Sequence, residues 1–329
     1  MAARIAALVV LAAGVAAAAI GWRLSQPLAL PASPYAFDVK TGASLKSVAS
    51  ELAAAKVLPA EWPLVALARA RGVDRAIKAG NYEIEEGVTL PRLLDMLTQG
   101  DVTETSLTIV EGSTFGELRA MLGADPGIAN HAKSLTDAEL MTKIGGVGAR
   151  PEGWFFPDTY LFAAGSSDLA ILARAHRLMR TRLDAAWAKR APGLPLKDPY
   201  EALILASIVE KETGRPSDRP LVASVFVNRL KAGMRLQTDP TVIYGMGKRF
   251  DGNLRKRDLE TDTPWNTYTR DGLPPTPIAL PGQASLDAVT NPPATPYLYF
   301  VARGDGTSEF SASLADHNRA VARFQKGAR

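Results

Sequence analysis

A short sequence pattern occurs three times between residues 39 and 122 and constrains the fold more than any other feature. Its copies read VKTGASLKSVASEL, IEEGVTLPRLLDML and IVEGSTFGELRAML, at residues 39–52, 84–97 and 109–122. Each has a strand-like entry, a glycine where a turn can require positive φ, and then a Ser or Thr that can cap a helix. Apolar residues follow at helical spacing. Their unequal separation argues against a solenoid, and the copies reflect either duplication or a recurring local motif.

The three copies predict strand–turn–helix units, and the rest of the chain fits a mixed α+β fold. With AGNYEI as a returning strand, residues 37–104 form a predicted small α+β module, followed by a connecting α+β segment over 105–150. From residue 151 to 329 we expect a larger mixed domain with a helical core, with helices over Ser167–Lys189, Pro199–Thr213 and residues 219–232. The polar, loop-rich sequence after these helices predicts a binding groove.

The N-terminus contains an uncharged apolar stretch of 18 residues, Ile5–Trp22, between Arg4 and Arg23. That length just spans the hydrocarbon core of a bilayer, so residues 1–23 are predicted to be an uncleaved transmembrane anchor. The alternative is a cleaved signal peptide, for which small residues such as Ala17 and Ala19 could form the cleavage site. Three prolines in the next segment make residues 24–36 a predicted stiff linker.

The composition excludes several kinds of chemistry. The chain has no cysteine and only three histidines, and no H-E-x-x-H motif occurs. Thiol catalysis, disulfides and Cys-ligated zinc are therefore excluded, and neither a catalytic metal nor another cofactor is expected. The net charge of +4 fits an anionic partner such as a membrane surface or an acidic polymer. Because Lys and Arg form no dense block, no nucleic-acid partner is predicted. Carboxylates are the leading catalytic candidates.

Two glutamates end an apolar predicted helix in the stretch LILASIVEKETG, residues 203–214. Residues two apart point about 200° away from each other on a helix, so Glu210 and Glu212 cannot share a face. Glu212 continues the most apolar row, where desolvation would raise its pKa from about 4.3 towards roughly 6 and suit it to general-acid catalysis. The alternative is a solvated helix end with a local ion pair.

Four longer blocks resemble a known family. They are ASIVEKETG, VASVFVNRLKAGMRLQTDPTVIYGMG, TPWNTYTRDGLPPTPIALPG and NPPATPYLYFVARGDG. Their order and spacing resemble the YceG-like endolytic murein transglycosylases, the MltG family. The resemblance implies a LysM-like module at residues 37–104 and a catalytic domain at 151–329. In lytic transglycosylases the catalytic Glu ends a helix and precedes a hydroxyl residue. Glu212–Thr213 matches that pair, so Glu212 is the predicted catalytic residue and Glu210 the alternative.

The resemblance also implies a function. The chain would be a membrane-anchored lytic transglycosylase, a lyase, that cuts the β-1,4 bond between N-acetylmuramic acid and N-acetylglucosamine in nascent glycan strands. It would form 1,6-anhydro ends and terminate elongation. It would be single-pass in the inner membrane, with the catalytic domain on the periplasmic side. Peptidoglycan synthases are further candidate partners. The alternative function is a non-catalytic peptidoglycan-binding scaffold.

Five residues in the family-like blocks are the predicted substrate contacts: Gln237, Asp239, Tyr244, Asn266 and Tyr268. Each has a simpler structural alternative, such as setting a turn. Arg229 and Asn228 could brace Glu212, although a surface ion pair is the simpler interpretation of Arg229. The chain also departs from the family pattern, with Thr238 where Ser is common, Trp265 for a frequent Tyr or Ala, Thr276 for Gly, and no His before Phe310. These departures concern the substrate contacts and not the reaction class.

Overall fold

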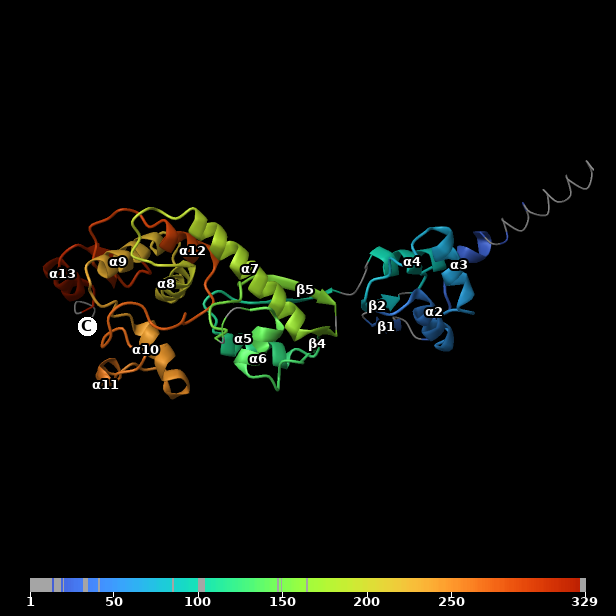
Figure 1. Cartoon of the computed structure of the whole chain (residues 1–329), viewed down its shortest axis with the longest axis horizontal. Coiled ribbons are helices and arrows are strands. Elements are labelled where there is room, and N and C mark those ends of the chain that lie inside the picture. The colour runs from blue at the N-terminus through green and yellow to red at the C-terminus, as the bar shows by residue number, and fades with distance from the viewer. Residues whose placement is uncertain are drawn as a thin grey trace, which may run out of the picture. The chain divides into compact units, whose positions relative to one another are not determined.

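The computed structural model describes residues 14, 19, 21–31, 35–40, 42–84, 86–99, 104–146, 148, 150–163 and 165–325. They form a mixed α+β structure of helices and small two-stranded sheets, as the sequence predicts (Figure 1). The chain divides into two compact units. Unit 1 comprises Met1–Ser106 and Leu161–Ser166, and unit 2 comprises Leu107–Tyr160 and Ser167–Arg329. Within these residues no helix has the length and apolar character needed to cross a bilayer. The predicted anchor, residues 1–23, lies largely outside them.

Unit 1 is a two-stranded sheet covered by three short helices. Its elements are β1 (Tyr35–Val39), α2 (Leu45–Ala54), α3 (Trp62–Ala70), β2 (Gly80–Ile84) and α4 (Leu90–Gln99). The two strands pair antiparallel, with Tyr35 opposite Ile84 and Val39 opposite Gly80. Apolar faces of all three helices bury a common core that includes Leu52, Leu64 and Leu93. Burial of such leucines is the main stabilising term of a small module.

The predicted strand–turn–helix units are confirmed. The glycine of each copy has positive φ: 84° at Gly42, 93° at Gly87 and 77° at Gly112. The Ser44 side chain accepts from the Ser47 backbone N–H at the start of α2. Thr114 forms a capping box with Glu117 at the start of α5 (Phe115–Ala124). The first two copies build unit 1, whereas the helix of the third lies in unit 2.

The segment after the predicted anchor packs on unit 1. Leu24, Leu28 and Leu30 lie against its apolar core. The Leu28 N–H donates to the Val88 carbonyl at 2.8 Å, and Pro27 forms a β-bridge with Thr89. The prediction of a stiff linker over residues 24–36 did not anticipate this packing. Proline stiffness gives no information about the leucines between the prolines, and these leucines are what bind the segment to the unit.

Unit 2 is built mainly from helices. Strands β3 (Glu104–Thr108) and β5 (Thr159–Ala163) pair with each other, and they and β6 (Ser166–Ser167) contain residues of both units. The first elements wholly within unit 2 are α5, β4 (Ile128–Ala129) and α6 (Asp137–Lys143). The later elements are α7 (Asp168–Ala188), α8 (Pro199–Glu212), α9 (Arg219–Lys231), α10 (Asp239–Met246), η1 (Gly247–Arg249), α11 (Lys256–Glu260), α12 (Gln283–Thr290), β7 (Tyr299–Ala302), β8 (Ser308–Ser311) and α13 (Leu314–Phe324). The helices predicted over 167–189, 199–213 and 219–232 are confirmed as α7, α8 and α9.

Helix α8 is the centre of unit 2. It begins at Pro199 after Asp198, whose side chain accepts from the Glu201 N–H. Eight consecutive residues, 202–209, are buried, because α7, α9 and α12 pack around the helix. A helix that is apolar on all sides is stable only inside a core, and only the two ends of α8 are partly exposed. The last turn carries Lys211 and both glutamates of interest.

Candidate active site

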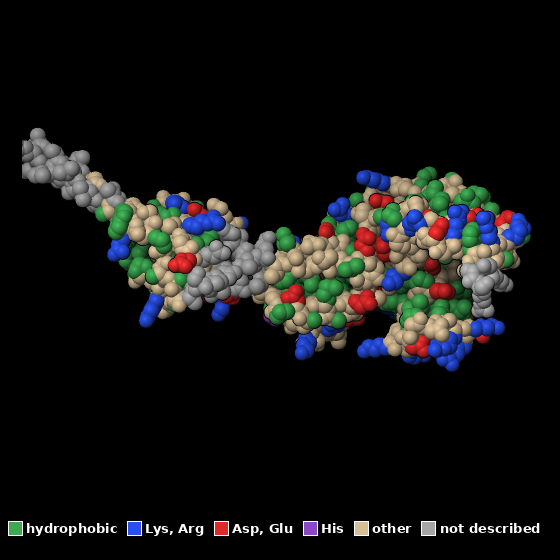
Figure 2. Space-filling model, turned by 180° about the vertical axis from the view of Figure 1, so that it is seen from behind, with side chains coloured by type: hydrophobic (Ala, Val, Ile, Leu, Met, Phe, Trp, Pro, Cys, Tyr) green, Lys and Arg blue, Asp and Glu red, His purple; other side chains and the backbone are tan. Residues whose placement is uncertain are grey.

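The end of α8 faces the beginning of α10. The α8 helix stops at Glu212 because Thr213 has extended backbone angles, φ −147° and ψ 127°. Helix α10 begins at Asp239 after Thr238. Figure 2 shows unit 2 hollowed between the lobe that contains α10 and α11 and the rest of the unit, with hydrophobic and acidic side chains in the hollow. The candidate site is the place where these two helix ends meet.

Glu212 is partly buried and, among the described residues, has one direct hydrogen-bond partner. The Thr238 hydroxyl donates to Glu212 Oε1. Burial raises the pKa of Glu212 to about 7, although the Thr238 hydrogen bond and the positive charge of Arg229 oppose that rise, while Asp239 adds to it. A carboxyl with a pKa near 7 has comparable protonated and ionised populations at neutral pH, so it can give up a proton and take one back.

Glu210 has an entirely different environment. Its side chain is 5% exposed, and its Oε1 lies 3.2 Å from Nη2 of Arg219, which is itself only 10% exposed. Its Oε2 accepts from the Gly282 N–H at 2.9 Å and from the Ser285 hydroxyl at 2.7 Å. Both carboxylate oxygens are therefore occupied by donors from α9 and the start of α12. This arrangement ties three helices together, which is a structural task.

Three of the predicted substrate residues gather around Glu212. Asp239 Oδ1 accepts from the Tyr268 hydroxyl at 2.6 Å. Burial, followed by the hydrogen bond to Asp239, raises the pKa of Tyr268. Gln237 directly precedes Thr238 and has φ 51°, an uncommon value for a residue other than glycine. Backbone strain of this kind is typical of functional sites, where surrounding structure enforces it.

The other two predicted substrate residues have internal partners. Asn266 is 0% exposed, and its Nδ2 donates to the carbonyls of Asp258, Leu259 and Thr261. Its Oδ1 accepts from the Tyr268 N–H at 2.8 Å, so Asn266 shapes the loop that presents Tyr268. Tyr244 donates its hydroxyl to Glu152 Oε2 at 3.0 Å. Within the described chain, no hydrogen bond joins Asn266 or Tyr244 to Glu212.

Arg229 is not part of a surface ion pair, contrary to the simpler interpretation of the sequence. It is 9% exposed and donates from Nε to the Leu298 carbonyl at 2.7 Å and from Nη1 to the Leu236 carbonyl at 2.8 Å. Its guanidinium lies 5.2 Å from the centre of the Tyr299 ring. The backbone carbonyls hold a fixed positive charge near Glu212, and this charge lowers the pKa of that carboxyl. Neighbouring Asn228 instead fixes the loop at Thr295.

Sequence reasoning missed a second carboxyl of unusual pKa, Glu152. It is 7% exposed and accepts from the Phe115 N–H at 3.0 Å as well as from Tyr244. Burial raises its pKa to about 7. The only sequence signal is an acidic residue separated by Gly153 from the aromatic run WFF. Because Tyr244 lies on α10, Glu152 helps to hold the helix whose first turn carries the Glu212 partner.

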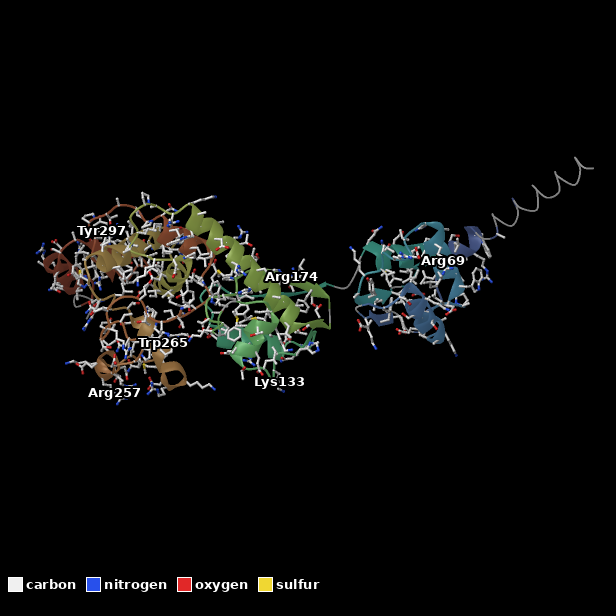
Figure 3. All side chains as sticks on the ribbon, in the orientation of Figure 1. Arg69, Lys133, Arg174, Arg257, Trp265 and Tyr297 are labelled. Carbon is white, nitrogen blue, oxygen red and sulfur yellow. The ribbon has the colours of Figure 1, made fainter. Side chains whose placement is uncertain are left out.

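Two of the departures from the family pattern contact each other. Trp265 donates from Nε1 to the Thr276 hydroxyl at 2.9 Å, and its ring packs edge-on against Tyr244. Figure 3 shows Trp265 beside α10, whereas Arg257 lies at the outer edge of the lobe. The third departure, Thr238, supplies the hydroxyl that binds Glu212. A threonine can donate that hydrogen bond as a serine can, so the substitution keeps the contact.

The described residues contain no group of three or more His, Cys, Asp or Glu side chains that could hold a metal ion. Acidic side chains near Glu212 are instead paired with hydroxyl groups, as Asp239 is with Tyr268. The chemistry available at this site is therefore proton transfer by a carboxyl of near-neutral pKa. The neighbouring groups are hydroxyls, an amide side chain and one fixed guanidinium.

Comparison with known proteins points to one family. The model of the YceG-like family matches residues 37–323. A protein of Bacillus subtilis named endolytic murein transglycosylase is 31% identical over an alignment 304 residues long, which covers 87% of this chain and 84% of that protein. A protein of the same name from Streptococcus pneumoniae is 28% identical over 75% of this chain and half of its own length. A crystal structure of a YceG-like protein from Listeria monocytogenes is 26% identical, with a TM-score of 0.53 over 87% of this chain and 99% of that one.

Proposed function

The chain belongs to the YceG-like family, and we propose that it is an endolytic murein transglycosylase, a lyase that cuts peptidoglycan glycan strands internally. One observation carries the proposal. The only glutamate at the end of α8 that is not held in an ion pair, Glu212, has a pKa of about 7 and faces the start of α10. The names of the relatives supply the substrate class, and the site supplies an acid suited to a glycosidic bond.

The reaction needs one group that acts first as an acid and then as a base. Protonated Glu212 donates its proton to the oxygen that links C1 of N-acetylmuramic acid to C4 of N-acetylglucosamine, and the C1–O bond breaks. The resulting carboxylate accepts the proton of the C6 hydroxyl of N-acetylmuramic acid as that oxygen bonds to C1. The products are a 1,6-anhydro sugar and a free C4 hydroxyl, no water is consumed, and Glu212 regains its proton.

The environment of Glu212 suits both steps. Burial keeps a protonated population at neutral pH for the first step. The Thr238 hydroxyl and the positive charge of Arg229 stabilise the carboxylate that the first step leaves behind. Glycosidases usually use two carboxyl groups, whereas here the attacking hydroxyl belongs to the substrate. Glu210 and Glu152, with their internal partners, are not needed as a second catalytic group.

We assign glycan contacts to the residues around Glu212. Gln237 uses its Oε1 to accept from Arg229 Nη1 at 3.4 Å, which leaves its amide nitrogen to donate to sugar hydroxyl or acetamido oxygens. Tyr268 offers an aromatic face whose position the Asp239 hydrogen bond fixes. Tyr244 and Asn266 support the walls of the site. Gln237, Asp239 and Tyr268 are therefore the proposed contacts, and Tyr244 and Asn266 are positioning residues.

The cellular setting is also part of the proposal. Residues 1–23 would anchor the protein in the inner membrane as a single span, with both units on the periplasmic side. Cleavage of nascent strands at the membrane would limit glycan length, which makes peptidoglycan synthases the expected partners. The N-terminal module, residues 37–104, would be LysM-like. The uncharged stretch at residues 5–22 supports the anchor.

Digestion of purified peptidoglycan by the full chain tests the proposal, with the products separated and identified by mass spectrometry. We expect internally cut strands with 1,6-anhydro ends from the wild-type protein, and none from Glu212→Gln. Hydrated reducing ends would instead identify a muramidase. Binding to peptidoglycan without any cleavage would identify the non-catalytic scaffold, and either result would overturn the proposal.

A further inference from the structure

Unit 1 contains a basic cavity that the proposed reaction does not use. Its volume is about 500 Å³, and it lies between the β1–α2 turn, α3 and the loop that follows α3. The polar or charged side chains in its lining are Lys40, Ser44, Lys46, Arg69, Asp74 and Arg75. The remaining lining is apolar or glycine, including Val39, Val65 and Ile77. We call this cavity the basic groove.

Positive charge is concentrated in the basic groove. Residues 21–99 contain nine Lys and Arg and eight Asp and Glu, so this part of the chain is close to neutral. Four of those nine cations line the groove, against one of the eight acids. None of the four forms an ion pair with a residue that the structure describes, whereas Arg71 on the same helix pairs with Asp95 at 2.8 Å. Four cations against one acid around a cavity favour an anionic ligand.

Helix α3 places an exposed tryptophan in line with this groove. Trp62, Val65 and Arg69 are three and seven residues apart, so they follow one face of α3. Val65 and Arg69 line the groove, and Trp62 is 69% exposed at the other end of the face. Figure 3 labels Arg69 on unit 1. An exposed tryptophan on the same helix face as a groove-lining arginine is of the kind found where proteins meet the headgroup region of a bilayer.

Unit 1 is also the part of the chain closest in sequence to the proposed anchor. Leu24, Leu28 and Leu30, which begin directly after it, pack on the core to which α3 contributes Leu64 and Ala68. If the anchor spans the membrane, this packing leaves little free chain between the bilayer and unit 1. The inference therefore rests on the anchoring in the proposed function.

We propose that unit 1 binds the membrane surface, with the basic groove taking the phosphate groups of anionic phospholipids and Trp62 inserting at the interface. The groove holds net positive charge in a concave site. Ser44, Leu45 and Lys46 at the start of α2 line it, where the helix dipole adds positive potential. The occupant we favour is lipid, because a soluble anion would make no use of the exposed Trp62. Carboxylates of peptidoglycan stem peptides are the competing ligand.

A fluorescence experiment on the full chain tests this. Because the chain has no cysteine, Ala66→Cys on α3 gives a unique site for an environment-sensitive fluorophore. The labelled protein is reconstituted into phosphatidylcholine vesicles with or without about 30% phosphatidylglycerol, and quenching by headgroup-level spin-labelled lipid is measured. We expect strong quenching only in the anionic vesicles, and its loss at about 0.5 M salt. A label at Ala185→Cys on α7 of unit 2 should show no dependence on lipid charge.

Charge reversals with a matched control identify the groove. In the variant Arg69→Glu with Arg75→Glu, the charge-dependent quenching should be at least about fivefold weaker than in the wild-type protein, because each basic residue near an anionic surface contributes to binding. The control Lys56→Glu with Arg71→Glu makes the same change of charge on unit 1 outside the groove, and should stay within about twofold of wild type. Equal quenching on neutral vesicles, or equal effects of the two variants, would overturn the proposal.

Soluble competitors separate the sources of the ligand chemistry. Inorganic phosphate and glycerophosphoglycerol should compete only weakly with vesicles, since neither engages Trp62. If peptidoglycan stem-peptide fragments abolished the charge-dependent quenching where the two phosphate compounds did not, the lipid assignment would be overturned. The proposed reaction is scored separately: Glu212→Gln should keep the lipid response and lose digestion of purified peptidoglycan, whereas the groove variant should keep digestion. Extraction of the wild-type chain from vesicles by alkaline carbonate would refute the anchor alone. In that case the chain should still float with anionic vesicles and not with neutral ones, and the groove variant should lose this flotation.

Discussion

The two sides of the last turn of α8 carry the same side chain in opposite situations. On one side, Glu210 is held by Arg219, Gly282 and Ser285, so all of its acceptor capacity is used inside the protein. On the other, Glu212 has one hydroxyl partner and a pKa raised to about 7 by burial. A buried carboxylate becomes structural when donors compensate its desolvation, and chemically useful when they compensate it only in part.

The comparison also separates two kinds of cost. Removing one partner of the Glu210–Arg219 pair leaves a buried charge without compensation, which destabilises a protein strongly. Removing the charge of Glu212 instead relieves a desolvation penalty that the folded protein bears above neutral pH. Glu212→Gln should therefore lose activity and gain stability above neutral pH, whereas Glu210→Gln should mainly lose stability. The predictions below test this contrast.

The largest expected effect is the loss of activity in Glu212→Gln. Glutamine keeps the shape of the side chain but cannot donate or accept a proton in exchange with the substrate, so peptidoglycan cleavage should fall about 10³-fold or more. Cleavage is measured as anhydro ends released per folded molecule. If Glu210→Gln lost activity to this extent while Glu212→Gln kept it, the assignment of the two glutamates would be reversed.

The second effect is the destabilisation caused by Glu210→Gln. Arg219 would be left largely buried opposite an uncharged amide, which should lower the free energy of unfolding by about 2 to 4 kcal/mol. Urea denaturation followed by circular dichroism measures this change. In a double-mutant cycle with Arg219→Gln, the pair should show a favourable coupling energy. A coupling of zero would mean that the contact has no structural task.

A smaller effect is the stabilisation that Glu212→Gln should bring above neutral pH. The folded pKa of Glu212, about 7, exceeds its ordinary value of 4.5, so the folded state binds more protons than the unfolded state between these values. Stability of the wild-type protein therefore falls as the pH rises from about 4.5 to 7, and Glu212→Gln avoids this loss. We expect the variant to be more stable by about 1 to 3 kcal/mol at pH 8, with no difference at pH 4. Equal stability at both pH values would contradict a desolvated carboxyl.

The smallest effect concerns Thr238. Its hydrogen bond lowers the pKa of Glu212, so Thr238→Val should raise that pKa further. Activity that requires protonated Glu212 declines as the pH rises through the pKa, and this decline should move upward by roughly half a unit to one unit. Thr238→Ser, which keeps the hydroxyl, should restore the wild-type pH profile of peptidoglycan cleavage. A change in overall rate without a shift would assign Thr238 a purely structural role.

Local sequence patterns predicted much of the fold because their physics is local. The spacing of glycine, hydroxyl residue and apolar row specifies a turn, a cap and a helix within about a dozen residues, as the confirmed φ values at Gly42, Gly87 and Gly112 show. The apolar row through Leu205 and Ile208 predicted Glu212 as the desolvated acid. That assignment stays a prediction, since both glutamates are partly buried and the Glu210 side chain is only 5% exposed. Resemblance to the family added the loop blocks around the site, which periodicity alone does not interpret.

The partners of the glutamates could not be predicted, since they come from distant parts of the chain. Ser285 reaches Glu210 from 75 residues away, and Thr238 reaches Glu212 from 26. The alternative of a solvated helix end with a local ion pair was wrong, because packing of α9 and α12 buries Glu210. Asn266 and Tyr244 carry no sequence mark that separates a loop-shaping or supporting side chain from one that contacts substrate.

The sequence by itself predicted the helices α7, α8 and α9, the strand–turn–helix units and the family, and it favoured carboxylate chemistry. Those properties depend on neighbours within a few turns of the chain or on long matching blocks. Only the tertiary structure decided which glutamate has its charge compensated by donors and which has a pKa raised to about 7. The reason is that the free energy of a charge depends on every group packed around it.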